Sequence, residues 1–222
     1  EEFRQATETF FHIKESSEMI ESNQVMYMLE LRKRLQAVEE EQREQTKKRN
    51  KLLYQSEHDE LTGLYNKRSL NRCLEDVFEA CKLNEKELLD IDYFKQLNDR
   101  YGHGKGDEGI CAVADTLKKI FPEDYVARYG GDEFLVVMTG RDLTYAMEHA
   151  ESLCAGIREY KIPNEDSELE PWLTISVGGV CAIPREPNRV WDFLSAADNT
   201  LYEQKKEQKG KVRFYQGEGK YL

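Results

Sequence analysis

Two acidic residues directly follow a pair of glycines in ARYGGDEFLVVM, residues 127–138. The apolar runs on either side predict the two strands of a β-hairpin, with Gly130, Gly131, Asp132 and Glu133 at its tip. Such a tip can be a solvated turn, in which the glycines supply positive φ angles and the acids keep the surface polar. It can also be a site at which carboxylates hold a cation and the glycines leave room for a phosphate-bearing ligand.

A second pair of acids lies at the end of another predicted strand. In ELLDIDYF, residues 87–94, Asp90 and Asp92 are two residues apart and share one face of an extended chain. Because a strand end twists, we expect one of them, rather than both, to face a ligand. If this strand neighbours the hairpin, Asp90 converges with Asp132 and Glu133, and such carboxylates require a cation, for which hard oxygen ligands favour Mg²⁺ or Mn²⁺. The spacing therefore favours a metal-dependent phosphoryl or nucleotidyl transfer site over a solvated turn.

The residues after Asp92 predict the start of a phosphate-binding helix. FKQLNDRYG, residues 94–102, has the composition of a short helix. The backbone N–H groups of Tyr93, Phe94 and Lys95 would lie free at its N-terminus, where phosphate groups bind well.

Composition and charge exclude several classes of protein. The chain has 222 residues and a net charge of −11, which makes nucleic acid and anionic membranes poor partners. No apolar run approaches the ~20 residues that span a bilayer, so we expect no membrane segment in this sequence. The five cysteines are scattered without a C-x-x-C spacing, which favours reduced thiols and a cytoplasmic location over a disulfide framework or a zinc site. Because the sequence opens at Glu1 in helix-like composition, we expect the cytosolic part of a longer sensor protein.

Residues 1–56 contain neither Gly nor Pro and are rich in Glu, Gln, Lys, Arg and Leu, which predicts one long helix. A helix of this length has no globular core of its own, so a dimeric coiled coil is favoured over a solvated connector. Its charges nearly cancel, which argues against a basic DNA-reading helix. The predicted seam consists of Phe10, Ile13, Ile20, Tyr27, Leu31, Val38 and Leu52, with a shifted register near Leu35.

Residues 57–222 form a second region, in which helical and strand-like stretches alternate. This order predicts an α/β fold with one central sheet covered by helices. The first strand has only Leu88 and Leu89 before its acids, so we expect it either to be short or to lack residues near 84–88. The expected helices span 67–83, 94–102, 107–120, 142–160 and 190–208, and the expected strands span 87–94, the two arms of 127–138, 172–180 and 212–215.

Three blocks of this region resemble one known family. DELTGLYN, DIDYFKQLNDRYGHGKGDE and RYGGDEF, in this order, closely resemble the GGDEF domain of bacterial diguanylate cyclases, over roughly residues 57–215. The resemblance implies a central, mostly antiparallel sheet wrapped by helices, similar to nucleotidyl cyclases and polymerase palm domains. It also implies an enzyme that condenses two GTP molecules into cyclic di-GMP and two pyrophosphates. Because each domain of this family holds one GTP, the active form would be a homodimer, regulated here through the coiled coil of residues 1–56.

The resemblance assigns a metal site residue by residue. Asp90 and Asp132 would be carboxylate ligands of two Mg²⁺ or Mn²⁺ ions per active site, together with the backbone carbonyl of Ile91. The ions would polarise the α-phosphate and lower the pKa of the attacking 3′-hydroxyl. Glu133 would lie beside them, and whether it or Asp132 takes the hydroxyl proton stays open. Lys95 would help to neutralise the phosphates.

The resemblance also assigns the nucleotide contacts. Asn98 and Asp107 would read the guanine edge, because a carboxylate can accept from the adjacent N1–H and N2–H₂ donors of guanine and finds no such pair on adenine. This preference argues against a hybrid enzyme that also accepts ATP. Gly130 and Gly131 would leave room for the nucleotide. A silent domain that only senses GTP or cyclic di-GMP is disfavoured because the GGDEF and DIDYFK blocks are intact.

Two stretches depart from the family pattern. AADNTLYEQKKEQKGK imperfectly resembles the family's phosphate-binding block: Lys205 matches its Lys, and Lys209 stands where the family has Arg, on the same predicted helical face. Lys lacks the bidentate fork of Arg, so we expect a weaker grip on the triphosphate. In FPED, residues 121–124, Phe121 replaces the Arg of the family's R-x-x-D product site while Asp124 is kept. This change predicts weak or absent feedback inhibition.

Overall fold

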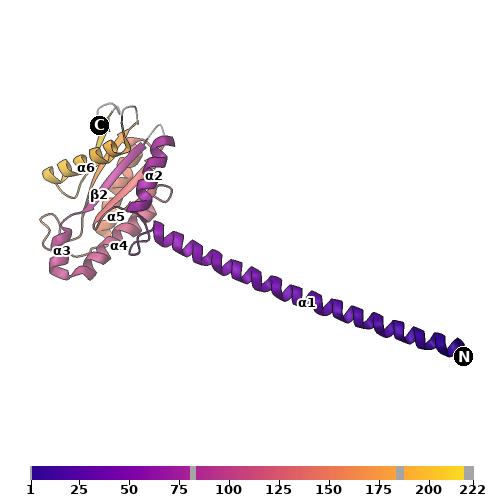
Figure 1. The fold of residues 1–222 in the computed structure, drawn as a ribbon. Coiled ribbons are helices and arrows are strands. Elements are labelled where there is room, and N and C mark those ends of the chain that lie inside the picture. Colours follow the sequence, from indigo (N-terminus) through magenta and orange to yellow (C-terminus); the bar gives the residue numbers. More distant parts are fainter. Residues whose placement is uncertain (1, 81–83, 184–187, 218–222) are drawn as a thin grey trace. The chain divides into compact units, whose positions relative to one another are not determined.

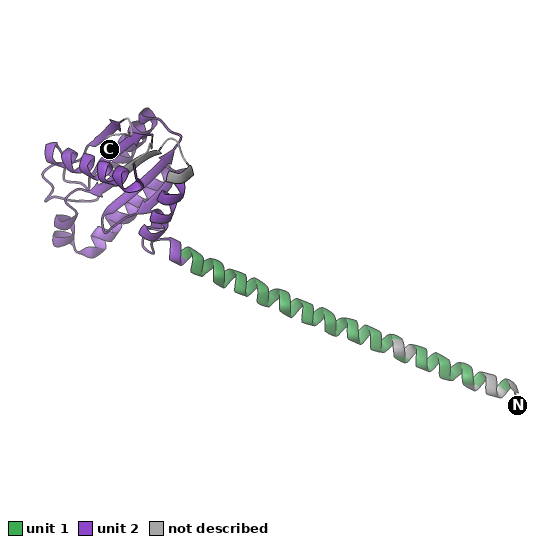
Figure 2. Ribbon diagram, turned by 45° about the horizontal axis from the view of Figure 1, so that its top comes forward, with its two compact units in different colours: residues 1–54 green, residues 55–222 purple. Residues whose placement is uncertain are grey.

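The computed structural model describes residues 2–80, 84–183 and 188–217. Contacts divide the chain into two compact units, residues 1–54 and residues 55–222 (Figure 2). None of the helices in the described residues combines the length and apolar character that crossing a bilayer requires.

The first unit is a single helix. Helix α1 spans Glu2–Glu57, as its composition without helix-breaking residues predicts, and its last residues already belong to the second unit. Among the described side chains of the predicted seam, Phe10, Tyr27 and Leu52 are 65%, 66% and 67% exposed in the single chain. Burial of these side chains therefore requires a partner from outside this helix.

The second unit, drawn in Figure 1, is built on a sheet of six strands within the described residues. Their order is β1-β3-β4-β2-β5-β6. The central pairs β3–β4, β4–β2 and β2–β5 are antiparallel, whereas the outer pairs β1–β3 and β5–β6 are parallel. The predicted mostly antiparallel sheet is therefore confirmed. The strands are β1 Tyr65–Asn66, β2 Asn84–Ile91, β3 Tyr125–Arg128, β4 Glu133–Thr139, β5 Ile175–Ala182 and β6 Val212–Gly217.

Helices pack on both faces of this sheet. Adjacent residues of β2 point to opposite faces, so Leu89 belongs to the core beneath α4 and α5, while Leu88 belongs to the core beneath α2 and α6. A Cβ at Gly178 of β5 would lie 2.2 Å from the backbone N of Leu201. Helix α6 therefore packs so close to β5 that only glycine fits at position 178. The helices are α2 Lys67–Ala80, α3 Phe94–Tyr101, α4 His103–Ile120, α5 Leu143–Glu159 and α6 Val190–Glu207.

Several predicted boundaries were wrong, most clearly at β2. This strand begins at Asn84, so the polar residues 84–87 are part of it, and it is eight residues long rather than short. The strand is this long because β2 lies between β4 and β5, so the backbone of Asn84 is paired with Thr139 on one side and with Ala182 on the other. The helix predicted for residues 67–83 is described as far as Ala80, and residues 81–83 lie outside the described part of the chain.

Candidate active site

The end of β2 and the tip of the hairpin meet at one edge of the sheet. β2 pairs with β4 so that Asp90 lies opposite Glu133, and the backbone N–H of Ile91 donates to the carbonyl of Asp132 at 3.3 Å. The structure thus brings together two adjacent pairs, Asp90 with Ile91 and Asp132 with Glu133, although the pairs are more than forty positions apart in the sequence. They are neighbours because β2 and β4 are adjacent in the sheet, and this strand order could not be predicted from the sequence.

Asp90 is a partly buried carboxylate held by a lysine. The Nζ atom of Lys205, on α6, lies 2.5 Å from its Oδ1 atom. Burial raises the pKa of the Asp90 carboxyl to about 6, and the charges of Asp132 and Asp92 act in the same direction, against the opposing effect of Lys205. The ionised form of Asp90 therefore depends on positive charge nearby, which a lysine or a divalent cation can supply.

Asp92 has a different environment from Asp90. The residue Asp92 is only 1% exposed. Its carboxylate accepts hydrogen bonds from Ser176 Oγ at 2.7 Å and from Thr174 Oγ1 at 3.1 Å. Burial raises the pKa of Asp92, while these hydrogen bonds oppose the rise. Of Asp90 in β2 and Asp92 just beyond its end, Asp90 is therefore the one placed to face a ligand. Ser176 in β5 and Thr174 just before it are two hydroxyl residues in an otherwise apolar stretch, and this pattern is the sequence signal for their role.

The hairpin tip is formed as predicted, but positive φ angles are not the reason for its glycines. The N–H groups of Tyr129 and Gly130 both donate to the carbonyl of Glu133, at 2.8 and 3.2 Å. Neither Gly130 nor Gly131 has a positive φ. A Cβ at Gly130 would lie 2.7 Å from Glu133 Oε2, whereas no described atom lies within 4 Å of a Cβ built at Gly131. Gly130 makes room for the Glu133 carboxylate, and Gly131 faces open space.

Helix α3 begins next to these carboxylates without a side-chain cap. Its N-cap residue Tyr93 has the left-handed angles φ 53 and ψ 32, and no side-chain cap hydrogen bond is formed among the described residues. The first N–H groups of a helix are not satisfied within it, so the N–H groups of Phe94 and Lys95 remain available for an anion. The Tyr93 hydroxyl donates to Glu168 at 3.2 Å, which fixes its ring beside the helix start.

The two predicted guanine-reading residues lie where α3 meets α4. The Oδ1 atom of Asn98 is buried and has no hydrogen-bond partner among the described residues. A Cβ at Gly106 would lie 2.1 Å from this atom, so the Asn98 side chain occupies the space that a side chain at position 106 would need. Asp107 follows directly on α4 and is exposed. An orphaned buried acceptor beside an exposed carboxylate fits a ligand that offers hydrogen-bond donors.

Lys209 does not lie on the helical face of Lys205, and that prediction was wrong. Helix α6 ends at Glu207, because Gln208 is extended with φ −162 and Gly210 takes the left-handed φ of 73. The Lys209 Nζ atom instead lies 3.8 Å from the ring centroid of Tyr93. The two lysines therefore reach the start of α3 and the end of β2 from different elements.

The carboxylates can supply part of a metal coordination shell. Within the described residues no group of three or more His, Cys, Asp or Glu side chains forms a ready-made metal site. Asp90, Asp132 and the Ile91 carbonyl offer hard oxygen atoms of the kind that Mg²⁺ and Mn²⁺ prefer, and Mg²⁺ commonly takes its other ligands from water and substrate phosphates. Asp90 fits such an ion because it is partly buried and its ionised form requires positive charge nearby.

The family profile described as "Diguanylate cyclase, GGDEF domain" matches residues 56–211, which is most of the chain. The chain belongs to the GGDEF diguanylate cyclase family. The resemblance of the three sequence blocks is thereby confirmed, and the matched residues contain the whole edge at which Asp90, Asp132 and Lys205 meet.

Curated relatives and solved structures agree with this GGDEF assignment. The probable diguanylate cyclase DgcC of Escherichia coli K12 is 31% identical over 164 residues, covering 71% of this chain and 43% of that protein. The diguanylate cyclase VdcA of Vibrio cholerae is 35% identical over 149 residues, covering 66% and 43%. The matched region thus spans less than half of either relative. The crystal structure of the coiled coil and GGDEF domain of DgcB from Caulobacter crescentus in complex with c-di-GMP shares the fold, with a TM-score of 0.71, 23% identity and coverage of 83% of this chain and 99% of that chain.

Proposed function

We propose that this GGDEF domain condenses two GTP molecules into cyclic di-GMP and releases two pyrophosphates. The observation that carries the proposal is the meeting of Asp90, Asp132 and Lys205 at one sheet edge, beside the uncapped start of α3. In the reaction, the 3′-oxygen of one GTP forms a bond to the α-phosphorus of the other, and the bond from that phosphorus to pyrophosphate breaks. Each GTP acts once as attacker and once as acceptor, so the ring closes.

The protein residues have separable tasks in this reaction. Two Mg²⁺ or Mn²⁺ ions held by Asp90, Asp132 and the Ile91 carbonyl would supply charge neutralisation and Lewis-acid polarisation when bound. Asn98 and Asp107 would hold the guanine. Their arrangement supports this role because the Asn98 Oδ1 atom is a buried acceptor that still lacks a donor among the described residues.

The phosphates would be neutralised from three directions. The N–H groups that open α3 favour an anion, and Lys95 lies exposed in the first turn. Lys205 already stands 2.5 Å from Asp90 and would turn to the phosphates once a cation satisfies that carboxylate. Lys209 would approach from the side of Tyr93. Glu133 or Asp132 would accept the proton that leaves the 3′-hydroxyl.

The second half-site would come from a second copy of the chain, joined through α1. The exposed seam of α1 supports this partner, as does an adjacent apolar stripe that contains Val25, Met28 and Leu35, 59%, 62% and 56% exposed. Met28 and Leu35 are seven residues apart, which is the heptad spacing of the shifted register predicted from sequence. A change in register or crossing of the two helices would bring the half-sites together or hold them apart.

Feedback inhibition through the R-x-x-D position would be weak or absent. Phe121 is only 1% exposed and contributes to the core, so it offers nothing to a ligand. Asp124 accepts a hydrogen bond from the Tyr145 hydroxyl at 3.2 Å, and its Oδ1 atom lies 3.9 Å from Arg141 Nε. An acid engaged in this way, without the Arg of the family motif, is a poor receptor for a guanine.

The deciding experiment identifies the product. Purified chain is incubated with GTP and Mg²⁺ at protein concentrations that ensure dimers, and the nucleotides are separated by chromatography. Cyclic di-GMP should form, and Asp132→Ala should abolish it. GTP binding without turnover would favour a silent sensor, and efficient competition by ATP would contradict the roles of Asn98 and Asp107.

A further inference from the structure

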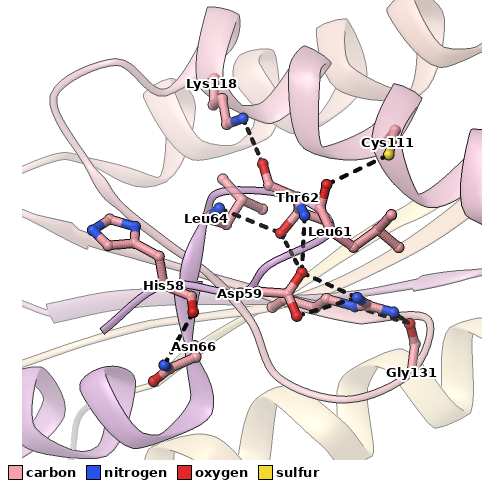
Figure 3. A network of polar contacts seen from close by, with 10 residues as sticks. His58, Asp59, Leu61, Thr62, Leu64, Asn66, Cys111, Lys118 and Gly131 are labelled. Carbon is pink, nitrogen blue, oxygen red and sulfur yellow. Dashed lines mark hydrogen bonds and ion pairs between the residues drawn. The ribbon is translucent and has the colours of Figure 1, made fainter. Parts of the chain in front are cut away.

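A single arginine joins the turn after α1 to the tip of the GGDEF hairpin. The turn comprises residues 59–64, and Figure 3 shows Asp59, Leu61, Thr62 and Leu64 of this turn together with Gly131 of the hairpin tip. Arg128 is the last residue of β3, just before the tip, and contacts both segments. The sequence blocks DELTGLYN and RYGGDEF contain these residues, but the proposed function gives no task to Asp59, Thr62 or Arg128.

Asp59 is held firmly within its turn. Its Oδ1 atom accepts hydrogen bonds from the backbone N–H and the hydroxyl of Thr62, at 3.0 and 2.7 Å (Figure 3). The turn is closed by backbone hydrogen bonds of 2.8 Å from Asp59 to the Leu64 carbonyl and from Gly63 to the Asp59 carbonyl. Burial acts to raise the pKa of Asp59, but the hydrogen bonds of Thr62 and the charge of Arg128 outweigh it and lower that pKa. Asp59 is therefore ionised and fixed, which makes it a rigid anchor for a cation.

The Arg128 guanidinium uses its two sides for two different partners. On one side NH1 donates to both carboxylate oxygens of Asp59, at 3.0 and 3.2 Å. On the other side Nε and NH2 donate to the carbonyl of Gly131, at 3.2 and 2.7 Å. The side chains of Arg128 and Asp59 are 16% and 24% exposed, so this ion pair is less screened by solvent than one on the surface. A planar guanidinium can serve both partners at once, whereas an ammonium cannot present this fork.

The Gly131 carbonyl belongs to the peptide that leads directly into Asp132. The carbonyl of Asp132 accepts from the N–H of Ile91, and the pairing of Asp90 with Glu133 continues the ladder of β2 and β4. Arg128 therefore fixes the peptide before Asp132, while the sheet fixes the peptide after it. Since a Cβ at Gly131 would meet no described atom within 4 Å, side-chain packing does not hold this residue.

We propose that Arg128 is a positioning residue for Asp132, and that Asp59 acts through it. In this role the turn after α1 sets the orientation of the Gly131–Asp132 peptide, and with it the carboxylate that the proposed function assigns to the metal. The turn is also tied to neighbouring elements. The Asn66 side chain donates to the carbonyl of Ser56, in the last turn of α1, at 2.9 Å, and the Lys118 ammonium of α4 donates to the carbonyl of Thr62 at 2.6 Å. A change at the end of α1 thus has a contiguous polar route to Asp132.

The test compares Arg128→Gln and Asp59→Asn with a matched control in the full chain. Arg141→Gln removes another partly buried arginine, whose NH2 donates to Glu123 at 2.9 Å, next to the far end of β4. Both test variants should show faster hydrogen–deuterium exchange in residues 129–134, where two amides donate to the Glu133 carbonyl, and Arg141→Gln should not. This measurement needs neither GTP nor metal.

Activity provides the second readout, and it rests on the proposed function. At saturating GTP the two test variants should lose roughly 10- to 100-fold in kcat, with the KM for GTP within about twofold of wild type, because a misplaced catalytic group costs rate more than binding. The double variant should lose no more than the worse single variant, because both act on one unit. Arg128→Lys, which keeps the charge and loses the fork, replaces Arg128→Gln if the latter does not fold.

The outcomes separate the two proposals. Unchanged exchange in residues 129–134, or faster exchange with wild-type kcat, would overturn the positioning role of Arg128. If wild-type chain forms no cyclic di-GMP, the proposed function fails, and exchange alone decides whether Arg128 holds the hairpin tip.

Discussion

The Nζ atom of Lys205 lies 2.5 Å from Asp90 Oδ1, so a residue of the last helix neutralises a carboxylate of the central strand. In the proposed function this pair would couple metal binding by Asp90 to phosphate binding by Lys205. Asp90 would be released to a cation when Lys205 moves to a phosphate, and charge at the edge of the sheet would stay balanced throughout.

Replacing Lys205 with Met should lower kcat/KM for GTP roughly 10- to 100-fold, since a charge-assisted hydrogen bond is worth about 1.5–3 kcal/mol. Lys205 opposes the burial that raises the pKa of Asp90 to about 6. The substitution should therefore raise that pKa further and move the acid limb of the kcat/KM–pH profile toward neutral pH. An acid limb that stays in place would show that Lys205 does not act on Asp90.

Replacing Asp90 with Asn should stabilise the metal-free protein at pH 8, although it removes a proposed metal ligand. The pKa of Asp90 is raised from 3.8 to about 6 in the fold, so the folded state binds this proton more tightly than the unfolded state. The contribution of Asp90 to stability therefore falls as pH rises from about 4 to about 6. Urea unfolding in EDTA should show a gain of about 3 kcal/mol at pH 8 that vanishes near pH 4. Exposed Asp107→Asn is the control, and an equal gain in both variants would contradict the role of burial.

Replacing Gly106 with Ala should weaken GTP binding, because the new methyl group would lie 2.1 Å from Asn98 Oδ1 and displace that side chain. We expect a rise in the KM for GTP of roughly tenfold, a loss of about 1.4 kcal/mol in binding. Gly104→Ala is a matched control on the same helix, since no described atom lies within 4 Å of its Cβ. Equal KM values for the two variants would refute the assignment of Asn98 to the nucleotide.

Replacing Leu31 and Val38 together with Glu should dissociate the proposed dimer, because both lie on the seam, 40% and 51% exposed in the single chain. Light scattering should report monomers at micromolar concentration, and the specific rate of cyclic di-GMP formation should rise with protein concentration. Gln36→Glu, outside either predicted register, is the control. Full activity from a monomeric variant would exclude the requirement for a second copy.

The sequence predicted the fold wherever pattern and composition act locally. The long helix follows from the lack of Gly and Pro in residues 1–56, and the hairpin follows from the apolar arms around Gly130 and Gly131. The start of β2 could not be predicted in this way, because the polar residues 84–87 are held extended by backbone pairing to strands on both sides.

The site was predictable to the extent that its residues lie in contiguous motifs. The family resemblance named Asp90 and Asp132, but their meeting depends on the pairing of β2 with β4. The contact of Arg128 with Asp59 joins residues 69 positions apart, so no local pattern could reveal it. Lys209 lies outside α6 because Gly210 takes a left-handed φ angle, and counting residues along a predicted helix cannot detect this end of the helix.

The hydroxyl of Ser176 would influence the phosphate binding proposed for Lys209 without contacting a phosphate itself. It donates to Asp92 at 2.7 Å and accepts from the N–H of Gly210 at 3.0 Å, directly after Lys209. The same hydroxyl thus holds the end of the central strand and the loop that carries Lys209. In a library of random variants, substitutions of this fully buried serine would show the same loss of GTP binding as substitutions of Lys209. Distance from the substrate would then be a poor guide to the origin of the defect.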